Sequence, residues 1–207
     1  MRIAALASGG GSVLEAILER GLPVAVVLVD RPCGAQDVAR GHGVAAVLVE
    51  RDSFGPGFDR VAFTDRVVDA LRAHDVDLLA MAGFMTVLAE AIFTAWPGRV
   101  VNTHPALLPA FRGAHAVRDA LTAGATVTGC TIHVATPAVD DGPVLAQETV
   151  PVLAGDDEAA LHERIKAVER RLYPATLASI VERGTVLVDP SGVSTATPSP
   201  PAPGARS

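Results

Sequence analysis

Short apolar runs alternate with amphipathic segments along the first half of the chain. The apolar runs are rich in Val, Leu, Ala and Ile, as in strands that are covered on both faces of a sheet. In the segments between them, apolar residues recur at helical spacing. The pattern predicts strands over 2–7, 23–30, 44–49 and 76–82, and helices over 13–20, 35–40, 58–73 and 88–95. Repeated strand–helix units of this kind predict a doubly wound α/β fold.

The second half of the chain continues this pattern less regularly. It predicts a short strand at Val100 and Val101, a helix over 114–122, strands over 126–135 and 144–152, a helix from the acidic residues 156–158 to about 182, and an edge strand over 185–188. In the helix expected over 58–73, the buried side is expected to carry Val61, Val67, Val68 and Leu71. We therefore expect a single-domain α/β fold with a mostly parallel, Rossmann-like sheet flanked by helices.

Length and composition fit one domain followed by a short tail. The 207 residues are enough for one substantial core, while Pro, Ser, Thr and Ala dominate from about residue 189. We expect the domain to span 1–188 and the tail over 189–207 to be disordered, because it has little apolar surface to bury. The two cysteines, Cys33 and Cys130, are too few for a disulfide framework or a zinc site, so no metal is expected.

Net charge and hydropathy limit the kinds of binding partner and the cellular compartment that we expect for the protein. The net charge of −6, without a run of Lys or Arg, argues against nucleic-acid binding. It does not exclude a small phosphorylated substrate, which backbone amides can hold. No apolar stretch approaches the ~20 residues that cross a bilayer, and no signal-peptide pattern begins the chain. We expect a cytoplasmic protein without a membrane partner, as a monomer or a homodimer.

A glycine-rich turn follows the first expected strand. The segment from Ser8 to Ser12 reads Ser-Gly-Gly-Gly-Ser and leads into a helix that Ser12 could cap. A turn of this kind presents backbone N–H groups at a helix N-terminus, where an anion is favoured. The spacing matches neither the dinucleotide fingerprint nor a P-loop, and a turn that merely redirects the chain is about equally expected. Asp30, an acid at the end of the second strand, keeps a nicotinamide cofactor open as an alternative.

The segment over 99–113 carries the polar residues that point to chemistry. Asn102 and His104 are two residues apart at the end of a short strand, so they face the same side of it. Pro105 holds His104 in an extended conformation, and Pro109 does the same to Leu108. Ligands of open α/β sheets bind at such strand ends. The turn over 136–143 could supply a carboxylate from Asp140 or Asp141, although a solvated loop whose aspartates cap its own backbone is equally expected.

The string Asn-Thr-His-Pro-Ala-Leu-Leu-Pro over 102–109 resembles the signature of the folate-dependent formyltransferases. The resemblance extends in the same order over most of 1–188, and the serine-glycine loop resembles the purine-biosynthesis branch. It implies transfer of a formyl group from 10-formyltetrahydrofolate to the amine of glycinamide ribonucleotide. Such a reaction needs a donor to an oxyanion, a proton carrier, and a carboxylate that raises the pKa of that carrier.

The resemblance assigns roles residue by residue. It implies Asn102, His104 and Asp140 as the catalytic residues, because 139–143 is similar to the apolar-Asp-x-Gly segment of the family. The implied ribonucleotide contacts are Gly10, Gly11, Ser12, Val13 and Glu169. The implied folate contacts are Arg60, Met85, Thr86, Val87, Leu88 and Asn102.

The chain departs from the family pattern at several positions. The family commonly has asparagine where this chain has Gly10 and Val13, and a basic or aromatic residue where it has Thr86. Arg112 stands where proline is frequent, a variant that resembles the branch acting on aminoacyl-tRNA or amino sugars. Against that branch, the chain shows no second RNA-binding domain and no basic surface signature.

The chain has five histidines besides His104, and two other functions are compatible with the sequence. We expect His42, His74 and His162 to be solvated, His133 to be structural, and His115 to be a candidate for the site. A hydrolase that releases formate from the same folate would use the same catalytic residues. A nucleotide-binding module without acyl transfer would make the Asn-x-His segment incidental.

Overall fold

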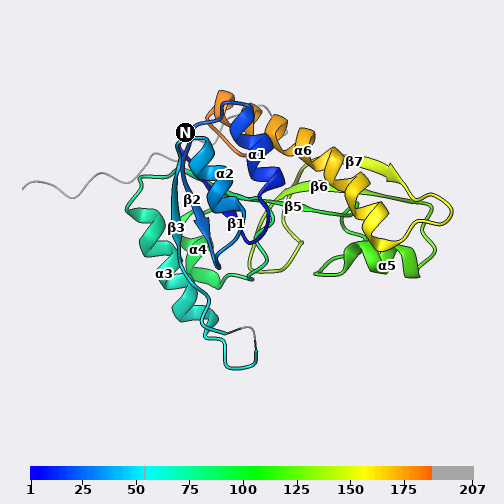
Figure 1. Ribbon diagram of the computed structural model, residues 1–207, viewed down its shortest axis with the longest axis horizontal. Helices are drawn as coiled ribbons and strands as arrows, with labels where there is room; N and C mark the ends of the chain where they lie inside the picture. The colour runs from blue at the N-terminus through cyan, green and yellow to red at the C-terminus, as the bar shows by residue number, and fades with distance from the viewer. Residues whose placement is uncertain (54, 188–207) are drawn as a thin grey trace, which may run out of the picture.

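The computed structural model describes residues 1–53 and 55–187, so the tail expected over 189–207 lies outside the described residues. A seven-stranded sheet forms the centre of the molecule, in the order β3-β2-β1-β4-β5-β6-β7 (Figure 1). Strands β1 to β5 are parallel, whereas β6 and β7 are antiparallel to their neighbours. The predicted mostly parallel α/β sheet is confirmed. The strands are β1 (Ile3–Ala7), β2 (Val24–Val29), β3 (Ala45–Leu48), β4 (Leu78–Met81), β5 (Val100–His104), β6 (Val127–Val134) and β7 (Val144–Pro151).

Helices cover both faces of the sheet, and the alternation of residues along β1 shows how. Ile3, Ala5 and Ala7 share one apolar core with α1, α2 and α6, whereas Ala4 and Leu6 share the other with α3 and α4. All of these residues are buried, as the uninterrupted apolar run predicts. The helices are α1 (Ser12–Glu19), α2 (Ala35–Gly41), α3 (Arg60–Arg72), α4 (Glu90–Ala95), α5 (Ala116–Thr122) and α6 (Glu158–Arg183).

The direction of the strand order reverses between β1 and β4. From β1 the chain moves outward through β2 and β3, then returns to β4 on the other side of β1. The connections that leave the carboxyl ends of β1 and β4 therefore diverge, and a crevice remains between them, where ligands of such sheets bind. Because β5 lies parallel to β4 and next to it, Asn102 and His104 at its carboxyl end lie on the same edge of the sheet as this crevice.

Three local expectations are wrong. The residue that caps α1 is Gly11, and Ser12 is already helical with no side-chain cap at that end. Val61 is 59% exposed, because Phe63 and Thr64 take the buried side of α3 beside Val67, Val68 and Leu71. Over 185–187 the chain forms no strand, and residue 188 lies outside the described residues. Within the described part of the chain, no helix is both long enough and apolar enough to span a membrane.

Candidate active site

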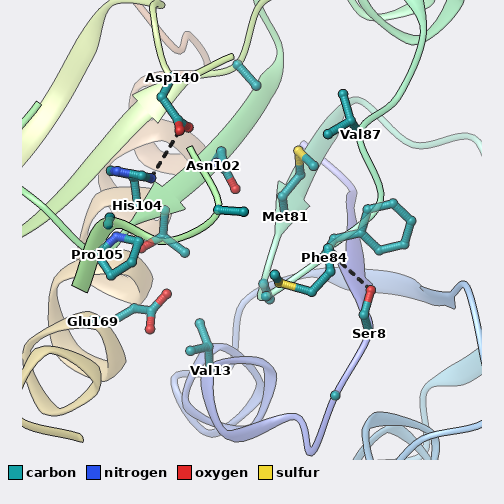
Figure 2. Close-up of a pocket in the computed structure, with 18 of the residues that line it drawn as sticks. Ser8, Val13, Met81, Phe84, Val87, Asn102, His104, Pro105, Asp140 and Glu169 are labelled. Carbon is teal, nitrogen blue, oxygen red and sulfur yellow. Dashed lines mark hydrogen bonds and ion pairs between the residues drawn. The ribbon is translucent and has the colours of Figure 1, made fainter. Parts of the chain in front are cut away.

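A cavity of about 490 Å³ lies at the carboxyl ends of β1, β4 and β5. Figure 2 shows its walls: the catalytic candidates on one side, apolar side chains opposite, and Val13 and Glu169 at another edge. Arg60, which begins α3, is not among the described residues that line it. The predicted site residues that do line it are Gly10, Gly11, Ser12, Val13, Met85, Thr86, Val87, Leu88, Asn102, His104, Asp140 and Glu169.

Asn102 and His104 reach the cavity from the end of β5 (Figure 2). Their alternation along the strand places both on one side, as the sequence predicts. The neighbouring strand β6 runs antiparallel, and its register sets His133 opposite Asn102 and Thr131 opposite His104. His104 is only 4% exposed, so its imidazole sits in a largely desolvated position.

Asp140 approaches His104 from the turn between β6 and β7. Its Oδ2 lies 3.2 Å from His104 Nδ1 and accepts a hydrogen bond of 2.8 Å from the N–H of Gly113. Asp140 has a φ of 53°, a left-handed conformation that aspartate tolerates better than most residues. A Cβ on Gly142 would collide with the carbonyl oxygen of Val134, so the sharp turn requires glycine there.

The neighbouring Asp141 points elsewhere. It forms an ion pair of 2.5 Å with Arg112 and is about half exposed, at 48% for its side chain. Of the two turn aspartates that the sequence leaves open, Asp140 is therefore the one beside the imidazole.

Both ring nitrogens of His104 face hydrogen-bond acceptors. Nδ1 faces Asp140, and Nε2 lies 2.7 Å from the carbonyl oxygen of Phe111. Burial lowers the pKa of His104 below its ordinary value, and the Phe111 carbonyl and the Asp140 charge oppose this shift only in part. The carboxylate of Asp140 does raise this pKa, as expected, but desolvation outweighs the attraction and the net shift is downward. The imidazole is mainly neutral near pH 7.

Asp140 remains ionised in the same surroundings. Burial alone would raise the pKa of its carboxyl, but its contacts with His133, the Gly113 N–H and His104 hold the pKa below its ordinary value. The pair therefore combines a negative carboxylate with a neutral imidazole that has acceptors at both nitrogens. A proton that arrives on His104 would be hydrogen-bonded on either side of the ring.

His133 is a site residue that the sequence reasoning assigned to structure alone. It lines the cavity, with Nε2 at 3.3 Å from Asn102 Nδ2 and 3.5 Å from Asp140 Oδ1. Its Nδ1 lies 3.1 Å from the carbonyl oxygen of Val134, an acceptor, so Nδ1 carries a proton. Nε2 can then accept from the Asn102 amide and fix its orientation. Only the pairing of β5 with β6 reveals this contact.

The glycine turn lies at the N-terminus of α1 and at the edge of the cavity. The first intrahelical hydrogen bond of α1 runs from Glu15 N–H to the Gly11 carbonyl, which leaves the amides of the first turn for other acceptors. Gly11 has a φ of 85°, and a Cβ there would lie 3.0 Å from Ala35 Cα. A Cβ on Gly10 would meet nothing within 4 Å. Gly11 thus shapes the turn, while Gly10 leaves the approach to the amides open.

Helix α6 brings polar side chains to the same edge. Glu169 lies in the cavity wall, and burial raises the pKa of its carboxyl, although a hydrogen bond with Thr103 and the charges of Lys166 and Arg170 oppose the shift. Lys166, the only lysine of the chain, and His162 also line the cavity.

The sequence did not predict Lys166 in the site, and His162 was expected to be solvated. Their positions relative to Glu169 did hold a signal, because residues three and seven positions apart share one face of a helix. His115, the histidine held as a candidate, also lines the cavity.

The opposite wall is mainly apolar and suits a flat ring system. It includes Met81, Phe84 and Val87 (Figure 2). Met85 and Val87 in this wall are exposed, at 63% and 47%. Cavities of this type bind small molecules through apolar walls and a few placed polar groups.

Asp30 does not support the nicotinamide alternative. Its carboxylate is fully buried and is hydrogen-bonded to Arg31 and Thr86, so it is not free to hold a ribose.

The fold and the Asn-x-His-Asp arrangement define a class of protein, and comparison of the sequence agrees with it. The profile of the family described as formyl transferase matches residues 1–177. The chain belongs to the formyl transferase family.

Individual relatives show which members of this family the chain is similar to. The chain is 45% identical to a phosphoribosylglycinamide formyltransferase of Mycobacterium tuberculosis over 192 residues, which cover 90% of this chain and 88% of the relative. Among solved structures, it resembles glycinamide ribonucleotide transformylase 1 from Symbiobacterium toebii, with a TM-score of 0.79, 43% identity and 84% of each chain covered. It also resembles phosphoribosylglycinamide formyltransferase from Bacillus halodurans, with a TM-score of 0.82, 36% identity, and 90% and 98% of the two chains covered.

Proposed function

We propose that the protein transfers the formyl group of 10-formyltetrahydrofolate to the amine of glycinamide ribonucleotide, in de novo purine biosynthesis. Family membership and the relatives named above support this activity. The observation that carries it is that one cavity joins Asn102, His104 and Asp140 to the glycine turn and to Glu169. Chemistry on the formyl group and recognition of a phosphorylated acceptor can therefore take place side by side.

The first step is attack of the amine nitrogen on the formyl carbon. The carbon becomes tetrahedral, and its oxygen takes on negative charge. The Asn102 amide can donate to that oxygen, because its Nδ2 carries two hydrogens and the contact with His133 Nε2, at 3.3 Å, uses only one of them. A donor that is already oriented stabilises the developing charge without reorganising during the reaction.

The second requirement is a proton transfer. The attacking amine must lose a proton, and the departing folate nitrogen must gain one before the carbon–nitrogen bond breaks. His104 begins neutral, since burial lowers its pKa, so it can accept the proton. Asp140 and the Phe111 carbonyl then stabilise the imidazolium until the proton moves to the leaving nitrogen.

The acceptor is held on the other side of the cavity. The first-turn amides of α1 and the side chain of Lys166 suit a phosphate, and the carboxylate of Glu169 suits ribose hydroxyls. The apolar wall from Met81 to Leu88 suits the folate ring. Arg60 has no contact with the cavity in this arrangement, so we do not assign it to the folate.

The test measures conversion of formyl-folate to tetrahydrofolate with and without the ribonucleotide. We expect consumption to depend on the ribonucleotide and formylated product to appear in equal amount. Glycinamide riboside, which lacks the phosphate, should be a poor acceptor, because remote binding energy positions the amine. Equally fast consumption without any acceptor would identify a hydrolase. No consumption under either condition would leave a binding module.

A further inference from the structure

A buried carboxylate that the proposed mechanism does not use lies behind the apolar wall. Asp30 follows β2 and has no exposed surface. Arg31 donates to both of its oxygens, from Nε to Oδ1 and from Nη2 to Oδ2, each at 3.0 Å. An isolated charge at such a position would be costly, so the role of Asp30 depends on the groups that hydrogen-bond to it.

Two of those partners belong to segments that line the cavity. The hydroxyl of Thr86 donates to Asp30 Oδ2 at 2.6 Å, from the loop that follows β4. Ser8, the residue after β1, also hydrogen-bonds to Asp30. Ser8 Oγ in turn accepts the backbone N–H of Met85 at 2.9 Å, a bond drawn in Figure 2. Asp30 is therefore connected to Met85 by way of Ser8 and to Thr86 directly.

We propose that Asp30 is a positioning residue for the folate-binding segment 85–88, acting through Thr86 and through Ser8. This inference rests on the proposed function, because it takes the segment to be the folate wall. The carboxylate joins the ends of β1 and β2 to the loop after β4, across the point where the strand order reverses. It fixes the height of the loop above the sheet while Met85 and Val87 remain exposed for contact.

The charge of Asp30 suits this role. Burial alone would raise the pKa of its carboxyl, yet the hydrogen bonds from Arg31, Thr86 and Ser8 hold the pKa below its ordinary value. An ionised carboxylate accepts from all three donors, and hydrogen bonds to a charged group are stronger than those between neutral groups.

The network also explains a departure from the family pattern. Thr86 stands where the family has a basic or aromatic residue, and its side chain is only 1% exposed. Its hydroxyl is directed at Asp30, and it also accepts from Arg51 Nη1 at 3.3 Å. In this chain the side chain at 86 therefore anchors the segment and leaves contact with the folate to its neighbours.

The experiment compares Asp30→Asn, Thr86→Val, Thr86→Ser and the double variant of the first two with the wild-type enzyme. Asparagine keeps the shape of Asp30 but places amide hydrogens against the Arg31 guanidinium. Valine keeps the shape of Thr86 without the hydroxyl, and serine restores the hydroxyl. We expect the KM for 10-formyltetrahydrofolate to rise by about tenfold or more in Asp30→Asn and Thr86→Val, as for loss of a hydrogen bond to a charged group. The KM for the ribonucleotide should change by less than about twofold.

Two further results are expected. Thr86→Ser should restore the folate KM to near the wild-type value. The double variant should be no worse than the poorer single variant, because both changes remove the same interaction. The matched controls are Thr128→Val, a buried threonine with no hydrogen-bond partner among the described residues, and Asp37→Asn on the surface of α2. Both should leave the two KM values unchanged.

Three outcomes would overturn the inference: an unchanged folate KM in Asp30→Asn, equal increases in KM for both substrates, or fold-changes that multiply in the double variant. Calorimetric binding of tetrahydrofolate to each variant separates this inference from the proposed function. A wild-type protein that binds tetrahydrofolate but transfers no formyl group would contradict the function, and weaker binding by Asp30→Asn would still support the positioning role.

Discussion

At the scale of single residues, the site depends on how one carboxylate is shared. Asp140 accepts from Gly113 and contacts both His104 and His133. It thereby holds the orientation of the His104 imidazole, which carries the proton. It also lies beside His133, which orients the Asn102 amide. The sequence places His104 and Asp140 far apart, and only the turn at Asp140 brings them to 3.2 Å.

Replacing His104 by Ala should lower kcat by ~10²–10⁴, the usual loss for a general acid or base. The fold should persist, since His104 ends a strand and is not part of an apolar core. Steady-state kinetics with both substrates saturating measures the effect, and His74→Ala, just after α3, is the control. A variant that keeps more than about a tenth of the wild-type kcat, a change below ~1.4 kcal/mol in the barrier, would exclude the role.

The pKa of His104 also predicts how stability depends on pH. Its folded-state pKa lies below the unfolded value of 6.5, so the unfolded chain binds the proton more readily. The stability that this difference provides is complete above the unfolded pKa and is lost as the pH falls from there toward the folded pKa. We expect the Tm to fall between pH 7.5 and 5.5, and to fall less in His104→Gln. His162, whose pKa burial also lowers, contributes in the same direction in both proteins and cancels in the comparison. An equal fall in both proteins would contradict the prediction.

Glu169 tests recognition of the acceptor. Glu169→Ala should weaken ribonucleotide binding by about 1.5–3 kcal/mol, as for hydrogen bonds to a charged group. The measurement is ribonucleotide binding by calorimetry, with folate affinity as the internal comparison. Glu182→Ala, an exposed position near the end of the same helix, is the matched control. Equal weakening of both substrates would show that Glu169 only supports the fold.

At the scale of elements, the turn from β1 into α1 separates two kinds of glycine. Gly10→Val should raise the KM for the ribonucleotide and leave the Tm near the wild-type value, because its Cβ has open space and φ is not positive. Gly11→Ala should instead lower the stability by ~1–2 kcal/mol, the usual cost of a left-handed conformation for an L-residue. Thermal unfolding and kinetics of the two variants distinguish these effects. If Gly10→Val affected both substrates equally, the turn would not be specific for the phosphate.

The elements themselves follow from local sequence to different degrees. The strands of the parallel half are continuous apolar runs, so their positions can be read directly. Asp59 and Asp157 cap α3 and α6 by accepting the N–H groups of Ala62 and Ala160. Val61 shows the limit of this reading, since an apolar residue near a helix end is buried only if another element reaches it.

At the scale of the whole molecule, the domain boundary can be tested by truncation. Helix α6 ends at Arg183, and Val186 beyond it is still buried in the main core. A chain that ends at residue 188 should keep the Tm and kcat/KM of the full protein, because the deleted residues 189–207 have little apolar surface to bury. A chain that ends at 184 should have a lower Tm, since it lacks Val186. A large loss of activity in the chain ending at 188 would assign a role to the tail.

The sequence by itself determined the α/β class, most of the strands and helices, and the family, because apolar runs and the string over 102–109 are local patterns. It also placed Asn102 and His104 on one side of a strand. Tertiary structure decided what depends on register and on burial. The pairing of β5 with β6 brought His133 to Asn102, and the packing of α6 brought Lys166 to the cavity. Desolvation lowered the pKa of His104 despite the nearby carboxylate. The reversal of strand order brought Thr86 within hydrogen-bond distance of Asp30. These contacts join residues distant in the chain, and a local pattern carries no information on which distant residues will meet.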